Sequence, residues 1–199
     1  TAQDYRFDPE HPPFARAWAA LPLLAMGNVT LDTRLIDAES APSWLAATQW
    51  EASHRFLYAD NDADRLLRAG RIMGLLLGVL LGAGLYRWAR ELYGPGPAAV
   101  ALALYAVEPN LLANAGLVTT DFSVAAFFFG AVYLLWRTVS HPTLANVAGL
   151  AACCALANIS KFSAALLFPL VALGLLSAVS RRRLTAATVL GVFGFTVFT

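Results

Sequence analysis

Long stretches without any charged residue fill the chain from residue 72 onward. These uncharged stretches include 72–86, 109–120, 122–136, 162–180 and 184–199. A bilayer core about 30 Å thick is crossed by roughly 20 helical residues, so these stretches and their polar flanks predict membrane-spanning helices. The predicted spans are about 71–90, 96–113, 120–138, 143–159, 162–180 and 184–199. The predicted fold class is therefore all-α, a polytopic membrane helix bundle of about six spans.

Charged residues are concentrated ahead of these spans. Of the 13 acidic residues in the chain, ten lie before residue 72, and the other three are Glu91, Glu108 and Asp121. This asymmetry predicts two regions in different solvents, a wet loop over 1–70 and a transmembrane bundle over 71–199. The net charge of +1 offers no basic surface for nucleic acid. The predicted environment of the bundle is the lipid bilayer.

The loop over 1–70 is expected to lie against the membrane surface. It contains an apolar run over 14–26 that includes Trp18, and further aromatic residues follow at positions 44, 50, 56 and 58. Tryptophan is favoured at the depth of the lipid headgroups, so we predict amphipathic juxtamembrane helices in the interface. Asn61 or Asp62 is expected to cap the first spanning helix.

Arginine residues predict the orientation of the bundle, because short cytoplasmic loops collect basic side chains. If the first span runs from outside to inside, every basic loop of the bundle falls on the cytoplasmic side. These loops contain Arg87, Arg90, Arg137 and the arginines at 181–183. The same alternation places the loop over 1–70, Asp121 and Lys161 together on the extracytoplasmic face. Glycines at a spacing of four, at positions 70, 74, 78 and 82, predict close helix packing along one face of the first span.

Three ionisable residues at the edges of predicted spans are candidates for chemistry, since a charge there usually faces a cavity or a partner. Asp121 either complements the dipole of the helix that it begins or orients and deprotonates a hydroxyl group. Lys161, the only lysine in the chain, either anchors a helix end by snorkelling or contacts a lipid phosphate. Glu108 is the third candidate, and a purely structural role explains it equally well.

Glu10 and His11 precede two prolines, which restrict the backbone and hold this pair close to the membrane surface; an ordinary loop explains them equally well. The sequence contains no HExxH or CxxC motif, no phosphate-binding glycine loop and no dinucleotide fingerprint. We therefore expect no metal site held by this chain alone and no organic cofactor.

Five motifs together resemble a known family. They are PEHPPFA at 9–15, RWARELYG at 87–94, EPNLLA at 108–113, TTD at 119–121 and SKFSA at 160–164. Their order and spacing resemble the bacterial branch of the protein O-mannosyltransferase-like glycosyltransferases. These are multi-spanning enzymes of the GT-C fold, and the aminoarabinose transferases that modify lipid A are related to them.

The resemblance implies transfer of a hexosyl or pentosyl group from a polyprenyl-phosphate donor to a protein, lipid or glycan acceptor, with inversion at the anomeric carbon. It places the reaction on the extracytoplasmic face of a bacterial plasma membrane. Asp121 matches the second outer acidic residue of the family and is the expected catalytic carboxylate, and His11 matches a contact to the donor phosphate. Lys161 matches a recurrent lysine that either contacts the lipid phosphate or pairs with a carboxylate. Glu10 and Glu108 are expected to support the site. The donor is a substrate and no cofactor is implied, while participation of a divalent ion stays open.

The resemblance covers only part of such an enzyme, whose leading acidic residue follows the first span. We therefore expect the chain to be an internal part of a longer protein, with that residue upstream of Thr1, and to be inactive by itself. Two other functions stay open at this point. A transporter or lipid flippase would use buried charges along a path at mid-membrane. A non-catalytic membrane subunit would need none of the candidate residues.

Overall fold

The structure is a computed structural model that describes residues 11–32 and 48–180, and all elements in these two ranges are helices. The short elements are α1 (Phe14–Ala20), the 3-10 helix η1 (Leu21–Ala25), α3 (Thr48–His54), the π-helix η2 (Arg55–Ala59), α6 (Pro109–Ala115) and the 3-10 helix η3 (Phe162–Leu166). The long helices are α4 (Ala63–Tyr93), α5 (Pro95–Val107), α7 (Thr120–Ser140), α8 (Leu144–Asn158) and α9 (Leu167–Ser180). The predicted all-α fold class is confirmed for the described residues.

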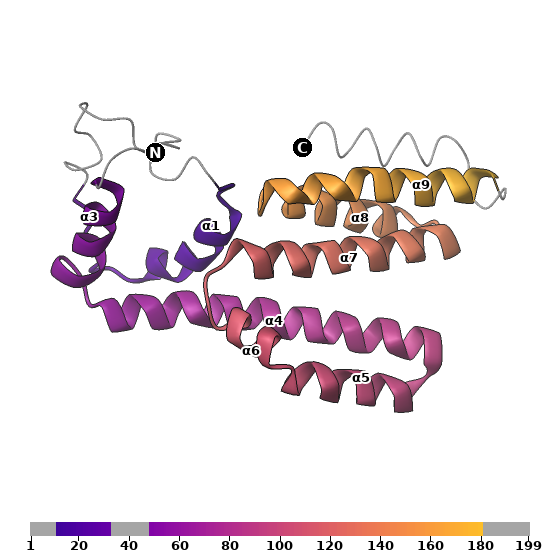
Figure 1. The fold of residues 1–199 in the computed structure, drawn as a ribbon, viewed down its shortest axis with the longest axis horizontal. Helices are drawn as coiled ribbons and strands as arrows, with labels where there is room; N and C mark the ends of the chain where they lie inside the picture. Colours follow the sequence, from indigo (N-terminus) through magenta and orange to yellow (C-terminus); the bar gives the residue numbers. More distant parts are fainter. Residues whose placement is uncertain (1–10, 33–47, 181–199) are drawn as a thin grey trace.

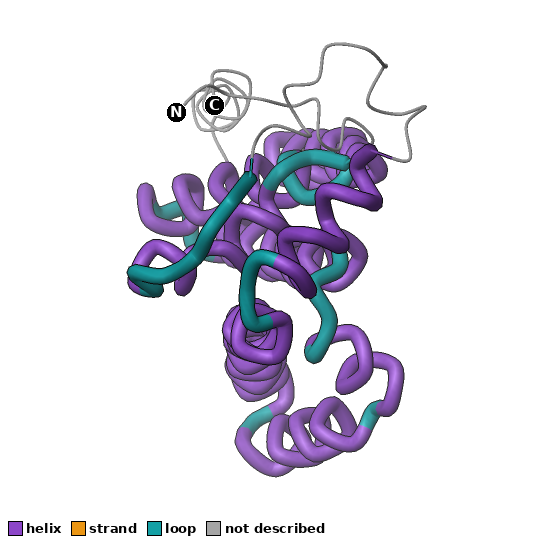
Figure 2. The backbone as a smooth tube through the Cα atoms, turned by 90° about the vertical axis from the view of Figure 1, so that its left-hand side faces the viewer, coloured by secondary structure: helices purple, strands orange, loops and turns teal. Residues whose placement is uncertain are grey.

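The long helices lie side by side along the long axis of the molecule (Figure 1). α4, α7 and α9 begin at the end of the bundle that carries α1 and α3, and α5 and α8 run back toward that end (Figure 1). α7 packs against α8 and α9, and α4 packs against α5. Figure 2 looks at the molecule from that end and shows the helices end-on, joined by short loops. Residues that begin α7 and α9 therefore share one end of the bundle, and the beginning of α4 extends beyond that end, below α1 and α3 (Figure 1).

Three described helical segments are long and apolar enough to cross a membrane, namely Ala63–Tyr93, Thr120–Ser140 and Phe162–Ser180. The segment predicted as a span over 96–113 is not one straight helix, because α5 and α6 meet at an angle of 64°. Glu108 has an extended backbone with ψ of 113°, as expected for a residue before proline, and Pro109 has no amide hydrogen to continue the helix. The broken pair counts as at most one further span.

Of the two remaining predicted spans, the structure describes one. The segment predicted over 143–159 forms α8, which has 15 residues and is shorter than the three long spans. The segment over 184–199 lies outside the described residues. A bundle of about six spans therefore stays a prediction.

The first spanning helix begins at Ala63, and Asp62, one of the two residues predicted to cap it, is its N-cap. The carboxylate of Asp62 accepts a hydrogen bond from the amide of Arg65 at 3.1 Å. Asn61 instead ties the preceding loop together, because its amide nitrogen donates to the carbonyls of Thr30 and Phe56, both at 2.8 Å. A glycine with positive φ, Gly94 at 86°, ends the helix and allows the tight turn into α5.

The glycines of α4 allow close packing as predicted. A Cβ atom on Gly74 would lie 2.6 Å from the carbonyl oxygen of Ala115, and one on Gly82 would lie 2.9 Å from the ring of Tyr105. The Tyr105 hydroxyl also donates to the carbonyl of Gly78 at 2.7 Å. The backbone of α4 therefore contacts the Tyr105 side chain of α5 and the backbone at the end of α6. The end of α6 leads directly into the loop before α7.

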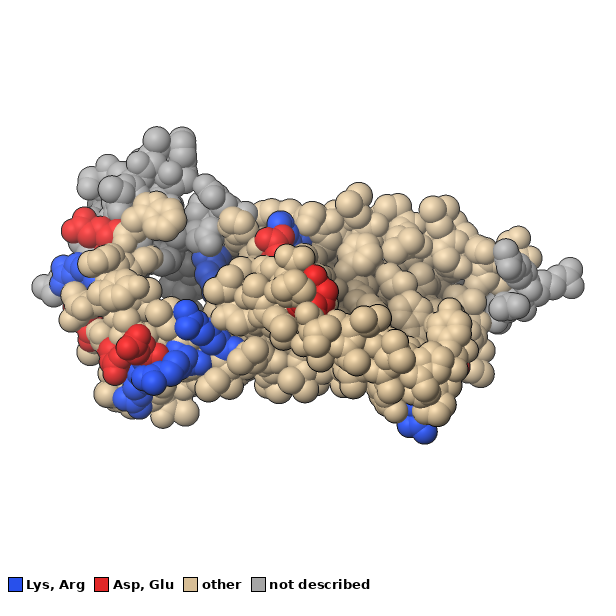
Figure 3. Space-filling model, turned by 60° about the horizontal axis from the view of Figure 1, so that its bottom comes forward, with Lys and Arg blue, Asp and Glu red and all other residues tan. Residues whose placement is uncertain are grey.

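The core lies between the helices, while much of the outer surface is also apolar. Leu150, Leu167 and Leu175 are completely buried between α7, α8 and α9. By contrast, Val79 on α4 and Leu173 on α9 are each 67% exposed. An exposed apolar surface over long helices is what lipid contact requires, since hydrocarbon tails are as apolar as leucine. Charged side chains gather over the end that carries α1, α3 and the beginning of α4 (Figure 3).

Candidate active site

α1 is docked over the end of the bundle at which α7 begins and α8 ends. The amide of Phe14 donates to the carbonyl of Ile159 at 3.0 Å, and its ring meets the ring of Phe127 edge-on at 4.9 Å. The indole nitrogen of Trp18 donates to the carbonyl of Met73 at 2.8 Å. These contacts hold the start of α1 beside the turn that carries Lys161, although the two segments are far apart in the sequence.

Asp121 and Lys161 form an ion pair at this end of the bundle. The ammonium group of Lys161 donates to Oδ1 of Asp121. Asp121 lies in the first turn of α7, which Thr119 caps through a hydrogen bond from the amide of Phe122 at 3.4 Å. The positive end of the helix dipole favours a carboxylate there. The structure therefore brings together the two residues that sequence analysis singled out from separate spans.

The turn that presents Lys161 is held by its own backbone. The amide of Lys161 donates to the carbonyl of Ala157 at 3.1 Å, and its carbonyl accepts from the amide of Ala164 at 3.0 Å. Ser160, which is completely buried, donates from its hydroxyl to the carbonyl of Leu156 at 2.6 Å. The side chain of Lys161 therefore starts from a fixed point between α8 and η3 and reaches α7.

The pair is open to solvent, since the Asp121 side chain is 69% exposed and that of Lys161 is 34% exposed. An ion pair in such surroundings contributes about 0–1 kcal/mol to stability, because water screens both charges. The fold therefore does not depend on it. A bound ligand can instead replace either partner at little energetic cost.

Glu108 is engaged in the joint between α5 and α6. Its Oε2 accepts from the amide of Leu111 at 2.7 Å, and its Oε1 accepts from the side chain of Asn110 at 3.0 Å. Both carboxylate oxygens thus serve the beginning of α6, and no hydrogen bond among the described residues joins Glu108 to Asp121 or Lys161. The structure gives this residue a helix-capping position, and its expected support of the site stays untested.

The segment before α1 contributes the remaining candidates. Glu10 lies outside the described residues. His11 is exposed, and its carbonyl accepts from a terminal nitrogen of Arg16 at 2.9 Å. Sequence analysis did not single out Arg16, although it is the only base in the apolar run over 14–26. Its guanidinium adds a cation next to His11, on the helix that Phe14 ties to the lysine turn.

A small, largely apolar hollow lies between α1, α4 and the beginning of α7, and its cavity volume of about 10 Å³ is roughly the room of one water molecule. Its walls include Trp18 from α1, Leu77 from α4 and Phe122 from α7, and it also reaches Thr119 and Ser123. Phe122 directly follows Asp121 in α7, but neither Asp121 nor Lys161 lines the hollow. Among the described residues, no three His, Cys, Asp or Glu side chains lie close enough together to hold a metal ion. The site therefore combines a carboxylate with cations.

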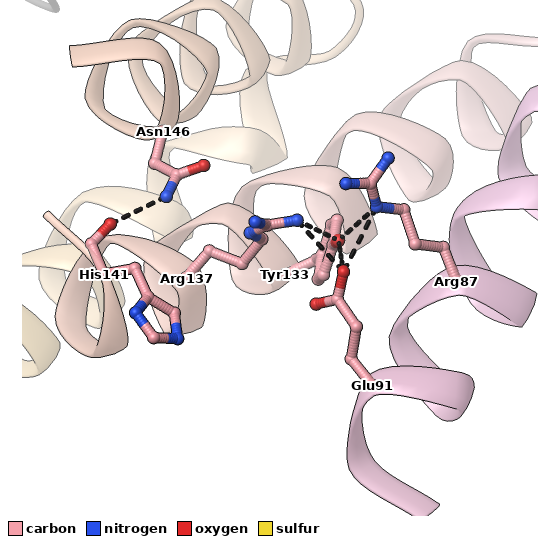
Figure 4. A network of polar contacts seen from close by, with 6 residues as sticks. All are labelled: Arg87, Glu91, Tyr133, Arg137, His141 and Asn146. Carbon is pink, nitrogen blue, oxygen red and sulfur yellow. Dashed lines mark hydrogen bonds and ion pairs between the residues drawn. The ribbon is translucent and has the colours of Figure 1, made fainter. Parts of the chain in front are cut away.

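The opposite end of the bundle carries the arginines of two predicted cytoplasmic loops. Arg87 at the end of α4 and Arg137 at the end of α7 both bind Glu91, at 3.2 Å and 3.0 Å (Figure 4). The prediction that these two loops share one side is confirmed, and the arginines at 181–183 lie outside the described residues. The Asp121–Lys161 pair and these arginines are therefore separated by the length of the spans.

The family assignment agrees with this architecture. A family model described as dolichyl-phosphate-mannose-protein mannosyltransferase matches residues 64–199, which begin with the first spanning helix and include Asp121 and Lys161. Neither a curated protein sequence nor a solved structure matches the chain. The chain belongs to the dolichyl-phosphate-mannose-protein mannosyltransferase family, which indicates a membrane glycosyltransferase of the GT-C type with a lipid-linked sugar donor.

Proposed function

We propose that the protein transfers a sugar from a polyprenyl-phosphate donor to an acceptor on the extracytoplasmic face, with inversion at the anomeric carbon. The observation that carries this proposal is the contact of Asp121 with Lys161 at a solvent-exposed end of the bundle. A carboxylate and an ammonium group side by side supply the two functions that the reaction needs. One receives a proton from the acceptor, and the other compensates the charge of the departing phosphate.

In the proposed reaction the acceptor hydroxyl attacks the anomeric carbon from the side opposite the lipid phosphate. A bond forms between the acceptor oxygen and this carbon while the bond from the carbon to the phosphate oxygen breaks. The electron pair of that broken bond leaves with the lipid phosphate, and the proton of the acceptor passes to the carboxylate of Asp121. Attack from the opposite side inverts the configuration. No nucleotide takes part in this step.

Lys161 is proposed to exchange its partner when the donor binds. In the structure it neutralises Asp121, and a phosphate placed beside it would draw the ammonium group away and leave the carboxylate basic. Partial exposure of the pair supports this exchange, since a screened ion pair is held weakly. His11 is proposed as a second phosphate contact from the segment ahead of α1. Glu10 and Glu108 are proposed to position this end of the molecule.

The arginines at the opposite end support the orientation, since basic residues favour the cytoplasmic side. Asp121 and Lys161 lie at the ends of their helical segments rather than along them. That position favours surface chemistry over a transport path at mid-membrane.

The proposal is tested by sugar transfer with the complete protein that contains this chain, carrying Asp121→Asn. The amide keeps the size of the side chain and removes the base, so transfer should fall about 10²- to 10⁴-fold while donor binding is retained. Lys161→Gln should weaken binding of the donor. The matched control is Asp64→Asn, which removes an exposed carboxylate from the first turn of α4 and should leave transfer unchanged. Undiminished transfer by Asp121→Asn would remove this residue from the mechanism.

A further inference from the structure

A polar cluster at the end of the bundle opposite Asp121 joins α4 to α7 (Figure 4). One carboxylate oxygen, Oε1 of Glu91, accepts from Arg87 Nε at 3.2 Å, from Tyr133 at 3.0 Å and from Arg137 Nη1 at 3.0 Å. The Tyr133 hydroxyl also lies 3.0 Å from Arg87 Nε and 3.1 Å from Arg137 Nη1. Two guanidinium groups are thus held side by side around one oxygen atom.

The cluster carries more positive charge than Glu91 neutralises. It also has more N–H donors than its own acceptors bind. Two arginines share one carboxylate, which leaves a net charge of +1 on these three side chains. A guanidinium has five N–H donors, and the described contacts use Nε of Arg87 and Nη1 of Arg137. The Nε of Arg137 is buried without an acceptor among the described residues. The outer atoms of Arg87 face solvent, since its side chain is 65% exposed.

The surroundings of the cluster are those of a membrane surface. Trp88 contacts Tyr133 and Trp136, with ring centroids 5.6 Å and 6.2 Å apart. Tryptophan and tyrosine are favoured at the depth of the lipid headgroups. Leu92 and Tyr93, which end α4, are 43% and 72% exposed. An anion bound to Arg87 would therefore lie next to apolar side chains. Such a site suits a phosphate headgroup that is attached to acyl chains.

We propose that Arg87 and Arg137 bind the phosphate of an anionic phospholipid at this end of the bundle. Planar guanidinium groups match the oxygens of a phosphate, and basic pockets between spanning helices suit acidic headgroups. Glu91 and Tyr133 act as positioning residues, because they keep the two guanidinium groups at a fixed spacing. This site is separate from the proposed transfer site and does not depend on it.

The test is titration of the complete purified protein with phosphatidylglycerol in detergent, followed by native mass spectrometry. Arg87→Gln should weaken binding about fivefold, the effect of one basic residue near an anionic headgroup. Arg137→Gln should act in the same direction, and Arg87→Gln remains informative if that variant does not fold, because Arg87 is mostly exposed. Glu91→Gln keeps an acceptor oxygen but removes the competing charge, so it should tighten binding by up to about fivefold.

Three controls decide between this site and simpler explanations. Arg68→Gln removes a positive charge near the start of α4, where Arg68 binds only the carbonyl of Asp64 among the described contacts, and should leave binding unchanged. Phosphatidylcholine should bind weakly, and inorganic phosphate should not compete at the concentrations that saturate phosphatidylglycerol. Equal losses in Arg68→Gln and Arg87→Gln, or weaker binding in Glu91→Gln, would overturn the proposal. Efficient competition by inorganic phosphate would overturn the assignment to a lipid.

Discussion

Gly74 is expected to be the least replaceable glycine of α4, because its neighbour is backbone. A Cβ atom there would lie 2.6 Å from the carbonyl oxygen of Ala115, a separation that real Cβ atoms do not show. Alanine favours a helix over glycine by about 1 kcal/mol. The clash works against this gain, since overpacking costs about 1–3 kcal/mol and here a whole loop would have to move. Gly74→Ala should therefore lower the free energy of unfolding by up to about 2 kcal/mol, the balance of the two effects.

The matched comparison is Gly84→Ala on the same helix. A Cβ atom there would lie 3.5 Å from the ring of Phe129, an ordinary contact, so this variant should be unchanged or more stable by up to about 1 kcal/mol. Thermal unfolding in detergent, followed by circular dichroism, measures both variants. Gly74→Ala should also reduce sugar transfer, because the displaced segment at Ala115 leads to Asp121. Stability of Gly74→Ala equal to or above that of Gly84→Ala would refute the packing argument.

Two further predictions concern the charged residues. Glu108→Ala should lower the free energy of unfolding by about 1 kcal/mol, since it removes the cap of α6, whereas Glu108→Asp should retain most of the stability; equal stability of the two variants in thermal unfolding would contradict the capping role. A double-mutant cycle of Asp121→Asn and Lys161→Gln should give a coupling energy below about 1 kcal/mol, because the pair is exposed. A coupling of several kcal/mol in the same measurement would make it a structural ion pair.

Local features of the sequence were sufficient for the fold class. The length of the uncharged stretches predicts spanning helices because a helix must satisfy its backbone hydrogen bonds within itself in lipid. The four glycines of α4 predicted close packing for a similar reason, since only small residues allow helices to approach. Hydropathy alone did not reveal the bend within 96–113, because Glu108 and Pro109 mark a break that an apolar average hides.

Contacts between segments far apart in the sequence could not be predicted from local sequence features. Asp121 and Lys161 are 40 residues apart, and each was a plausible helix-end residue when considered separately. Their pairing depends on how α7, α8 and η3 pack. Arg16 was overlooked because it looks like an isolated base in an apolar run until α1 is docked against Ile159. The role of Glu91 in joining α4 to α7 likewise needed both helices in place.

The sequence by itself determined that this chain is an α-helical membrane protein with most of its acidic residues ahead of the spans, and its motifs indicated the glycosyltransferase family. Those properties depend on residue type, on spacing along one segment and on the solvent that each segment requires. The tertiary structure decided which charges meet, namely Asp121 with Lys161 at one end and Arg87, Arg137 and Glu91 at the other. The physical reason is that an ion pair needs contact in space, and helix packing rather than local sequence determines which helix ends come together.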